Sequence, residues 1–269
     1  MTIPIALTIA GSDSGGGAGI QADLKAFAAC GVYGASVITA LTAQNTRGVS
    51  GIHEVPPEFI TAQIDAVFSD LDVKAVKIGM VSQRPVIEAI VAGLMRWSPR
   101  HVVVDPVMVA TSGDRLLSGD AVDALRRLLI PRATIITPNL PEAAALLEEP
   151  VAASETEIVG QGERLLRLGC AAVLIKGGHG DGPDSTDYLV RREGVVRLAA
   201  PRIATPNTHG TGCTLSSAIA AGLAKGQPLE AAVRQAKVYI SAAIAAADRL
   251  DVGHGHGPVH HFFAFDDRS

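Results

Sequence analysis

Residues 3–10 read Ile3-Pro-Ile-Ala-Leu-Thr-Ile-Ala10, and the glycine-rich segment Gly11-Ser-Asp-Ser-Gly-Gly-Gly-Ala-Gly19 and a helical pattern from Ile20 follow. A short, nearly all-apolar run followed by glycines and a helix is typical of a strand buried on both faces of a parallel sheet. This stretch therefore predicts an α/β fold.

Five more apolar runs repeat the pattern, namely Val37–Thr42, Ala75–Ile78, Val102–Asp105, Thr134–Thr137 and Ala172–Lys176. Between them lie helical stripes such as residues 60–71 and 87–94, and Gly31 and Gly169 stand where helices end. This order predicts a central, mostly parallel sheet with helices on both faces and right-handed crossovers.

One segment departs from that order. Thr186–Arg191, Glu193-Gly194 and Val195–Leu198 form a hairpin pattern, which predicts a small antiparallel edge. Two helical patterns, Cys213–Ala224 and Leu229–Leu250, close the chain. Because no linker, repeat or shift in composition interrupts residues 1–269, we expect a single domain.

Composition excludes several functional classes. With 48% hydrophobic and 19% charged residues, the 269-residue chain is not disordered. A net charge of −4 and 4% aromatic residues argue against nucleic-acid binding. The long uncharged segments, Ala26–Thr46 and Ile203–Ala224, contain Gly, Pro, Asn or His, so no membrane span is expected. Met1–Ala10 lacks the features of a signal peptide. Three cysteines exclude a disulfide framework, and we expect a cytoplasmic protein.

Polar or glycine residues follow each predicted parallel strand. In open parallel sheets, ligands bind outside the carboxyl ends of the strands, so these groups should converge on one crevice. They are Gly11–Asp13, Gln44-Asn45, Gly79-Met80, Asp105, Asn139 with Glu142, and Lys176–Gly178.

The segment Gly15–Gly19 matches neither the dinucleotide-binding glycine pattern nor a Walker A motif. It indicates a loop that lets backbone approach a ligand, and a plain turn is the alternative. Asp23 is placed in the first turn of the following helix, where it would either serve the site or interact with the helix dipole.

His209-Gly-Thr-Gly-Cys213 is the strongest local signal, because a glycine-rich helix start suits a phosphate anion. There the pKa of the Cys213 thiol should be lowered. The alternative is a small buried cysteine.

Asp105 and Glu142 could hold Mg²⁺ beside phosphates, or Asn139 and Glu142 could form only a capping box. Lys176 at a buried strand end favours an anionic ligand. The segment Gly253–His261 holds four of the eight histidines. We expect these histidines to form hydrogen bonds or cover an edge, with metal binding as the weaker alternative.

Seven motifs in order carry a more specific signal: residues 10–23, 39–46, Lys77–Met80, Asp105–Met108, Thr137–Glu142, Lys176–His179 and His209–Cys213. Together with the tail at 252–261, they resemble the bacterial hydroxymethylpyrimidine/phosphomethylpyrimidine kinases of thiamin biosynthesis. The resemblance runs from about Ile5 to Phe262. It implies a ribokinase-like three-layer fold and a homodimer.

The resemblance also implies an activity. ATP with Mg²⁺ would phosphorylate 4-amino-5-hydroxymethyl-2-methylpyrimidine to its monophosphate and then to the diphosphate. Gln44 would bind the aminopyrimidine edge, and Asp23 would lie near the substrate side. The ring pocket would be lined by Gly11, Ala18, Met80 and Val107.

The phosphate side follows from the same resemblance. Asp105 and Glu142 would organise Mg²⁺, and Lys176, with Asn139, would contact ATP. The catalytic group would be Cys213, with an anion hole formed by Gly210, Thr211 and Gly212.

Two positions depart from related patterns. Sugar kinases of this fold place Asp where Cys213 stands, which leaves a weaker base, and Gly15 stands where Ser is commoner. Two alternatives stay open: a pyridoxal kinase with the same chemistry, and a catalytically silent pyrimidine-binding protein on a kinase fold.

Overall fold

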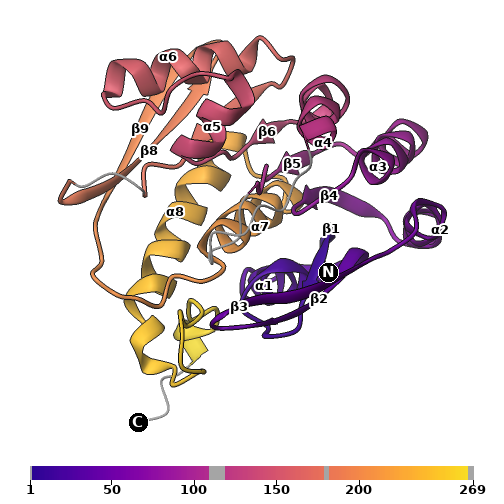
Figure 1. The fold of residues 1–269 in the computed structure, drawn as a ribbon, viewed down its shortest axis with the longest axis horizontal. Coiled ribbons are helices and arrows are strands. Elements are labelled where there is room, and N and C mark those ends of the chain that lie inside the picture. The colour runs from indigo at the N-terminus through magenta and orange to yellow at the C-terminus, as the bar shows by residue number, and fades with distance from the viewer. Residues whose placement is uncertain (1, 109–118, 179–181, 266–269) are drawn as a thin grey trace.

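The computed structural model describes residues 2–108, 119–178 and 182–265. The strands in this part of the chain are β1 Ile5–Asp13, β2 Tyr33–Asn45, β3 Gly48–Glu54, β4 Val73–Ile78, β5 Val102–Val104, β6 Ile135–Ile136, β7 Ala172–Ile175, β8 Asp184–Arg191 and β9 Gly194–Pro201. They form one sheet in the order β3-β2-β1-β4-β5-β6-β7-β8-β9 (Figure 1). Neighbours from β2 to β7 in that order pair in parallel, whereas β3 at one edge and β8 and β9 at the other pair antiparallel.

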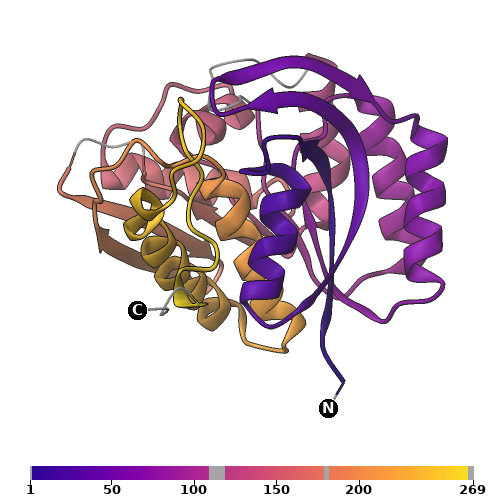
Figure 2. The same ribbon diagram turned by 90° about the horizontal axis from the view of Figure 1, so that it is seen from below.

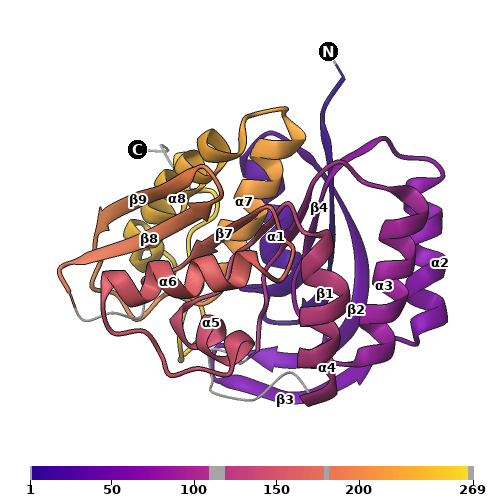
Figure 3. The same ribbon diagram turned by 90° about the horizontal axis from the view of Figure 1, so that it is seen from above.

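Helices cover both faces of this sheet (Figures 2 and 3). The α-helices are α1 Gly19–Ala29, α2 Pro57–Phe68, α3 Arg84–Trp97, α4 Gly119–Ala124, α5 Leu140–Leu147, α6 Glu155–Leu166, α7 Thr211–Ala224 and α8 Leu229–Ala245. Shorter helical turns span Leu125–Leu129, Ile130–Arg132, Ala247–Arg249 and Phe263–Phe265.

The two cores show why the strands are apolar on both faces. Val102 and Val104 of β5 pack in the cluster that includes residues of α2 to α6, whereas Val103 between them packs with α1, α7 and α8. Alternate residues of one strand thus serve opposite layers. The predicted three-layer ribokinase-like fold with helices on both faces is confirmed.

All six predicted parallel strands and the β8–β9 hairpin are present, but one edge was missed. The chain turns after Asn45 and returns as β3, which pairs antiparallel with the second half of β2. Gly48, Ser50 and Gly51 give β3 no apolar alternation, so no strand signal was visible. The last long helix ends at Ala245 rather than Leu250, with a 3-10 turn after it.

The first two strands are longer than predicted, and this shapes the site. The pairing of β1 with β2 continues to Asp13 opposite Thr42, with an irregularity between Ala10 and Ser12. Gln44 therefore lies within β2, opposite Val49 of β3, and does not follow a strand end. Among the described residues no helix is both long enough and apolar enough to cross a membrane.

Candidate active site

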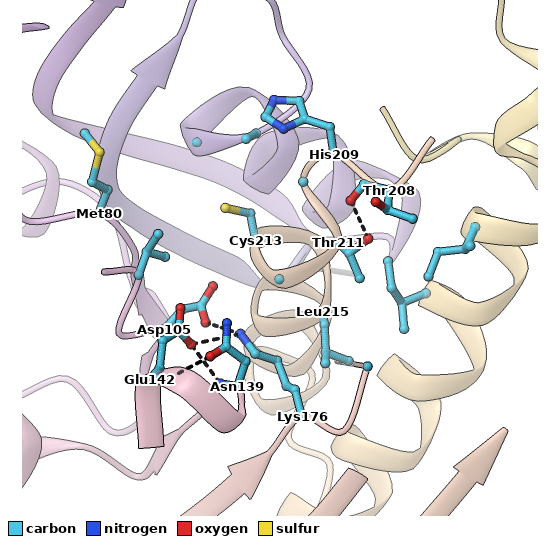
Figure 4. A pocket seen from close by; sticks show the side chains of 18 of the residues that line it. Met80, Asp105, Asn139, Glu142, Lys176, Thr208, His209, Thr211, Cys213 and Leu215 are labelled. Carbon is cyan, nitrogen blue, oxygen red and sulfur yellow. Dashed lines mark hydrogen bonds and ion pairs between the residues drawn. The ribbon is translucent and has the colours of Figure 1, made fainter. Parts of the chain in front are cut away.

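A pocket of about 770 Å³ lies at the carboxyl ends of the parallel strands. Its lining contains all the predicted site residues except Asp23 (Figure 4): Gly11, Ala18, Gln44, Met80, Asp105, Val107, Asn139, Glu142, Lys176, Gly210, Thr211, Gly212 and Cys213. Segments far apart in the sequence thus meet in one cavity, as the strand-end rule predicts.

One wall carries a buried charge cluster. Lys176 Nζ donates to Asp105 Oδ1 at 2.8 Å and lies 3.7 Å from Glu142 Oε2. Thr137 Oγ1, directly beyond β6, also donates to Asp105 Oδ1 at 2.9 Å. Asp105 is 1% exposed and Glu142 7% exposed, so the surrounding protein screens these charges weakly.

The pKa values of the three groups in this cluster are shifted in different directions. Burial opposes ionisation of Asp105, but Lys176 and Lys77 outweigh it and hold the pKa of this carboxyl below its ordinary value. Burial raises the pKa of Glu142 to about 7, with Lys176 opposing that rise and Asp105 adding to it. Burial alone would lower the pKa of Lys176, but the two carboxylates outweigh it and raise that pKa. Asp105 and Lys176 are therefore an ion pair, and Glu142 keeps its proton to a higher pH than an ordinary carboxyl does.

Asn139 has the structural role that its spacing allowed. It is the N-cap of α5, its Oδ1 accepts from Glu142 N at 2.8 Å, and its own N–H donates to Glu142 Oε2 at 2.7 Å. The capping box is confirmed. The same hydrogen bonds hold Glu142 at the pocket, so this residue both caps α5 and lines the site.

The start of α7 lies beside the charge cluster and also lines the pocket. Gly210 is its N-cap with φ +80°, and a Cβ there would meet Gly17 O at 1.9 Å, so only glycine fits. A Cβ on Gly212 would lie 3.2 Å from Lys176 Nζ, which shows how closely the helix start approaches the cluster. Thr211 N–H already donates to Thr208 O at 3.2 Å. The predicted anion hole would therefore rest on the N–H groups of Gly210 and Gly212.

The expected low pKa of the Cys213 thiol is wrong. Burial raises the pKa to about 11; nearby Lys77 opposes this rise, whereas Asp23 and Asp105 add to it. The helix start contributes only about half a unit charge, which does not offset burial beside two carboxylates. Cys213 is therefore a neutral thiol at pH 7 before any ligand binds.

Asp23 is not among the residues that line the pocket. It stands in the second turn of α1, so the predicted first-turn position is wrong, and the alternative of an interaction with the helix dipole falls with it. Lys77 Nζ donates to both of its oxygens, at 2.9 and 2.8 Å. Thr8 Oγ1 and Ser217 Oγ donate to it as well, at 2.6 and 2.7 Å. Asp23 thus holds Lys77, which itself lines the pocket.

Another part of the pocket lining, near the start of α1, is apolar and backbone-rich. A Cβ on Gly11 would lie 2.5 Å from Met80 Cε, so glycine lets the Met80 side chain lie over the strand. Thr39 Oγ1 donates to Met80 O at 3.0 Å and fixes that backbone. Val107 and Ala18 complete the apolar surface, and Gln44 supplies a polar group beside it.

A pair that sequence reasoning missed joins the two glycine-rich loops. Asp13 accepts from the N–H groups of Gly15, Gly17 and Ala18, and His209 Nε2 lies 3.0 Å from its Oδ2. Burial opposes ionisation of Asp13, but hydrogen bonds from His209 and Ala18 outweigh it and hold the pKa of the carboxyl below its ordinary value. Both residues lay inside quoted motifs; their 196-residue separation hid the contact.

The histidine-rich tail packs and forms hydrogen bonds. His261 Nε2 lies 2.9 Å from Thr214 Oγ1 of α7, and His256 N donates to Thr46 O at 2.9 Å. Within the described ranges no group of three or more His, Cys, Asp or Glu could hold a metal. The hydrogen-bonding interpretation is the better one. His179, at the end of the Lys176 motif, falls outside the described residues.

Known proteins share both sequence and fold with this chain. The family model for phosphomethylpyrimidine kinase matches residues 13–260. A hydroxymethylpyrimidine/phosphomethylpyrimidine kinase of Rhizobium meliloti is 64% identical over 96% of this chain and 97% of its own.

Two solved structures extend the comparison. The phosphomethylpyrimidine kinase of Clostridium difficile is 47% identical, with TM-score 0.80 over 90% of this chain and 100% of its own. An ADP complex of Bacillus subtilis pyridoxal kinase is 35% identical, with TM-score 0.91 over 99% of this chain and 100% of its own. On these matches, which span nearly its whole length, the chain belongs to the phosphomethylpyrimidine kinase family.

Proposed function

We propose that this protein is an ATP-dependent kinase that converts 4-amino-5-hydroxymethyl-2-methylpyrimidine to its monophosphate and then to its diphosphate. One observation carries the proposal: a buried Asp105–Lys176–Glu142 cluster and an apolar wall with the single amide of Gln44 line the same pocket. In Figure 4 the Cys213 thiol lies above the Asp105–Lys176 pair, with Met80 to one side. The first group suits phosphates and the second a flat, polar-edged ring.

The donor set fits a Mg²⁺ ion carried with ATP. Mg²⁺ in kinases is held by one or two carboxylates, waters and substrate phosphates rather than by an all-protein cage. Asp105 and Glu142 lie close enough for their repulsion to help raise the pKa of Glu142. These two residues would hold the ion, which supplies charge neutralisation at the phosphates.

The chain's own groups then account for the transfer. Lys176 would neutralise phosphate oxygens, and the N–H groups at the start of α7 would bind the anion that develops. Phosphoryl transfer passes through a loose transition state, so positioning and charge neutralisation dominate. Cys213 is a neutral thiol at rest, so it would take the hydroxymethyl proton only as a thiolate, after its own proton has passed to solvent or to a phosphate oxygen. The second acceptor is a phosphate, already anionic, which needs no base.

The alternative substrate is pyridoxal, because the fold matches that of the B. subtilis pyridoxal kinase at 35% identity. The higher identity to the Rhizobium enzyme favours the pyrimidine. A silent binding protein is disfavoured, since a binder of pyrimidines has no use for a buried lysine paired with two carboxylates.

We also propose that residues 1–269 fold as one domain, that the protein forms a homodimer and that it works in the cytoplasm. A single sheet with two flanking cores supports the first point. Leu41 of β2 and Ile52 of β3 are exposed on opposite faces of the β2–β3 edge, and a second copy would cover such apolar side chains. The three free cysteines suit a reducing compartment.

The test is mass analysis of products after purified protein is incubated with Mg·ATP and the pyrimidine, with pyridoxal in a parallel reaction. Sequential mono- and diphosphate support the proposal. Monophosphate alone reduces it to the first step, and exclusive conversion of pyridoxal replaces it.

A further inference from the structure

The Gln44 side chain makes polar contacts with two neighbours, His209 and Thr42. Its Nε2 lies 3.4 Å from His209 Nε2, and its Oε1 lies 3.1 Å from Thr42 Oγ1. Each contact is acceptable only if the right atom carries a hydrogen. The neighbours of His209 and Thr42 decide which atoms do.

Asp13 decides the proton on His209. Its carboxylate is ionised and surrounded by donors, so His209 Nε2, at 3.0 Å from Oδ2, has to carry a hydrogen. A protonated Nε2 cannot accept from the Gln44 amide. Its one hydrogen points mainly to Asp13, and toward Gln44 it offers only the weaker branch of a shared hydrogen bond, which an amide oxygen can accept and an amide NH₂ cannot.

Ser12 decides the hydroxyl of Thr42. Thr42 Oγ1 lies 2.9 Å from Ser12 O, a backbone carbonyl that only accepts. A hydroxyl has one hydrogen, and the shorter contact takes it. Thr42 Oγ1 is then an acceptor toward Gln44, which calls for an amide NH₂ at the position 3.1 Å away.

A half-turn of the Gln44 amide satisfies both conditions, because its oxygen and nitrogen have nearly the same shape. We propose that Asp13, through His209, and Thr42 fix the Gln44 amide with its oxygen toward His209 and its NH₂ toward Thr42. His209 is thus a specificity-determining residue for the ring. The inference rests on the proposed function.

The fixed amide retains one acceptor and one donor for the ring. Its oxygen has a second lone pair on the His209 side, and its NH₂ has a second hydrogen on the Thr42 side. An aminopyrimidine edge matches this order, with an amino donor beside a ring-nitrogen acceptor. The 4-oxo analogue in its lactam form carries C=O and N–H in those places, which reverses the order.

The experiment compares kcat/KM for the 4-amino substrate and the 4-oxo analogue. Both transfer the same phosphate to the same hydroxymethyl group, so damage to the phosphate side cancels in the ratio. Wild-type protein should prefer the amino ring about 10³-fold or more, since a reversed edge leaves buried polar groups unpaired. H209L should reduce this preference by up to about tenfold, because at most one hydrogen bond to the amide is lost. H209Q, which again offers an N–H, should keep most of it.

T42V tests the same amide from its other side without touching His209 and should also lower the preference. T61V removes a comparable hydroxyl, bonded to Pro57 O on α2, and should leave the ratio unchanged. Unchanged ratios in both H209L and T42V would overturn the inference while the kinase assignment stands. A wild-type chain that phosphorylates neither ring would overturn both.

Discussion

Replacing Asp23 by leucine should destabilise the protein severely, although Asp23 does not line the pocket. Its carboxylate accepts from Lys77, Thr8 and Ser217, and both Asp23 and Lys77 are 0% exposed. Burial alone would lower the pKa of Lys77, but the acidic groups around it, Asp23 foremost, outweigh burial and raise that pKa to about 12. D23L therefore leaves a buried ammonium without its counter-charge.

The size of the effect follows from that geometry. Removing one partner of a buried ion pair costs about 3–5 kcal/mol, because the remaining charge has no compensation. Native domains are stable by about 5–15 kcal/mol, so D23L should lose a large share of its stability. K77M should cost less than D23L, because Asp23 keeps two hydroxyl donors. In the double variant the second substitution should cost much less than it does alone.

Urea unfolding of the four proteins, followed by circular dichroism, gives the interaction free energy. Coupling of about 2 kcal/mol or more is expected. Effects that simply add would refute the claim that Asp23 acts by holding Lys77. If D23L fails to fold, D23N with K77M closes the same cycle.

Four further predictions concern the pocket. C213A should lose much of the first phosphorylation, retain the second and still bind the pyrimidine; wild-type rates for both steps, measured separately, would remove the base role. Q44L should raise the pyrimidine KM about tenfold by leaving a ring group unpaired; an unchanged KM would place Gln44 outside the ring site. Alkylation of Cys213 by iodoacetamide, read by peptide mass spectrometry, should rise toward pH 11, and a plateau near pH 8 would contradict the pKa of about 11. Glu142 has a folded pKa of about 7 against an ordinary 4.5, so the folded state holds its proton longer and stability falls as pH rises between these values. E142Q should remove up to about 3 kcal/mol of that fall, and parallel pH–stability curves would show that Glu142 is not its source.

Much of the fold could be predicted because its signals are local. Strands buried on both faces carry β-branched runs with no alternation, and six of them were found this way. The β3 strand could not be, because pairing with β2 rather than its own composition makes it a strand. A propensity argument has no access to such a tertiary cause.

The site divides along the same line. Strand-end position and motif order located Lys176, Asp105 and the residues at 210–213. The prediction of a low pKa for Cys213 was wrong because the groups that bury it, and the carboxylates of Asp23 and Asp105, belong to other parts of the chain. The Asp13–His209 contact joins two loops 196 residues apart, and no pattern within either loop encodes it.

The proposed function requires that one pocket phosphorylate the pyrimidine alcohol and then phosphorylate the resulting monophosphate. The most direct test follows the products over time by mass spectrometry, starting from the alcohol with Mg·ATP and, separately, from its monophosphate. Both reactions should end in the diphosphate, and both should slow together in K176M, which lacks the buried ammonium group. Activity on the alcohol alone, or a K176M protein with wild-type rates, would contradict it.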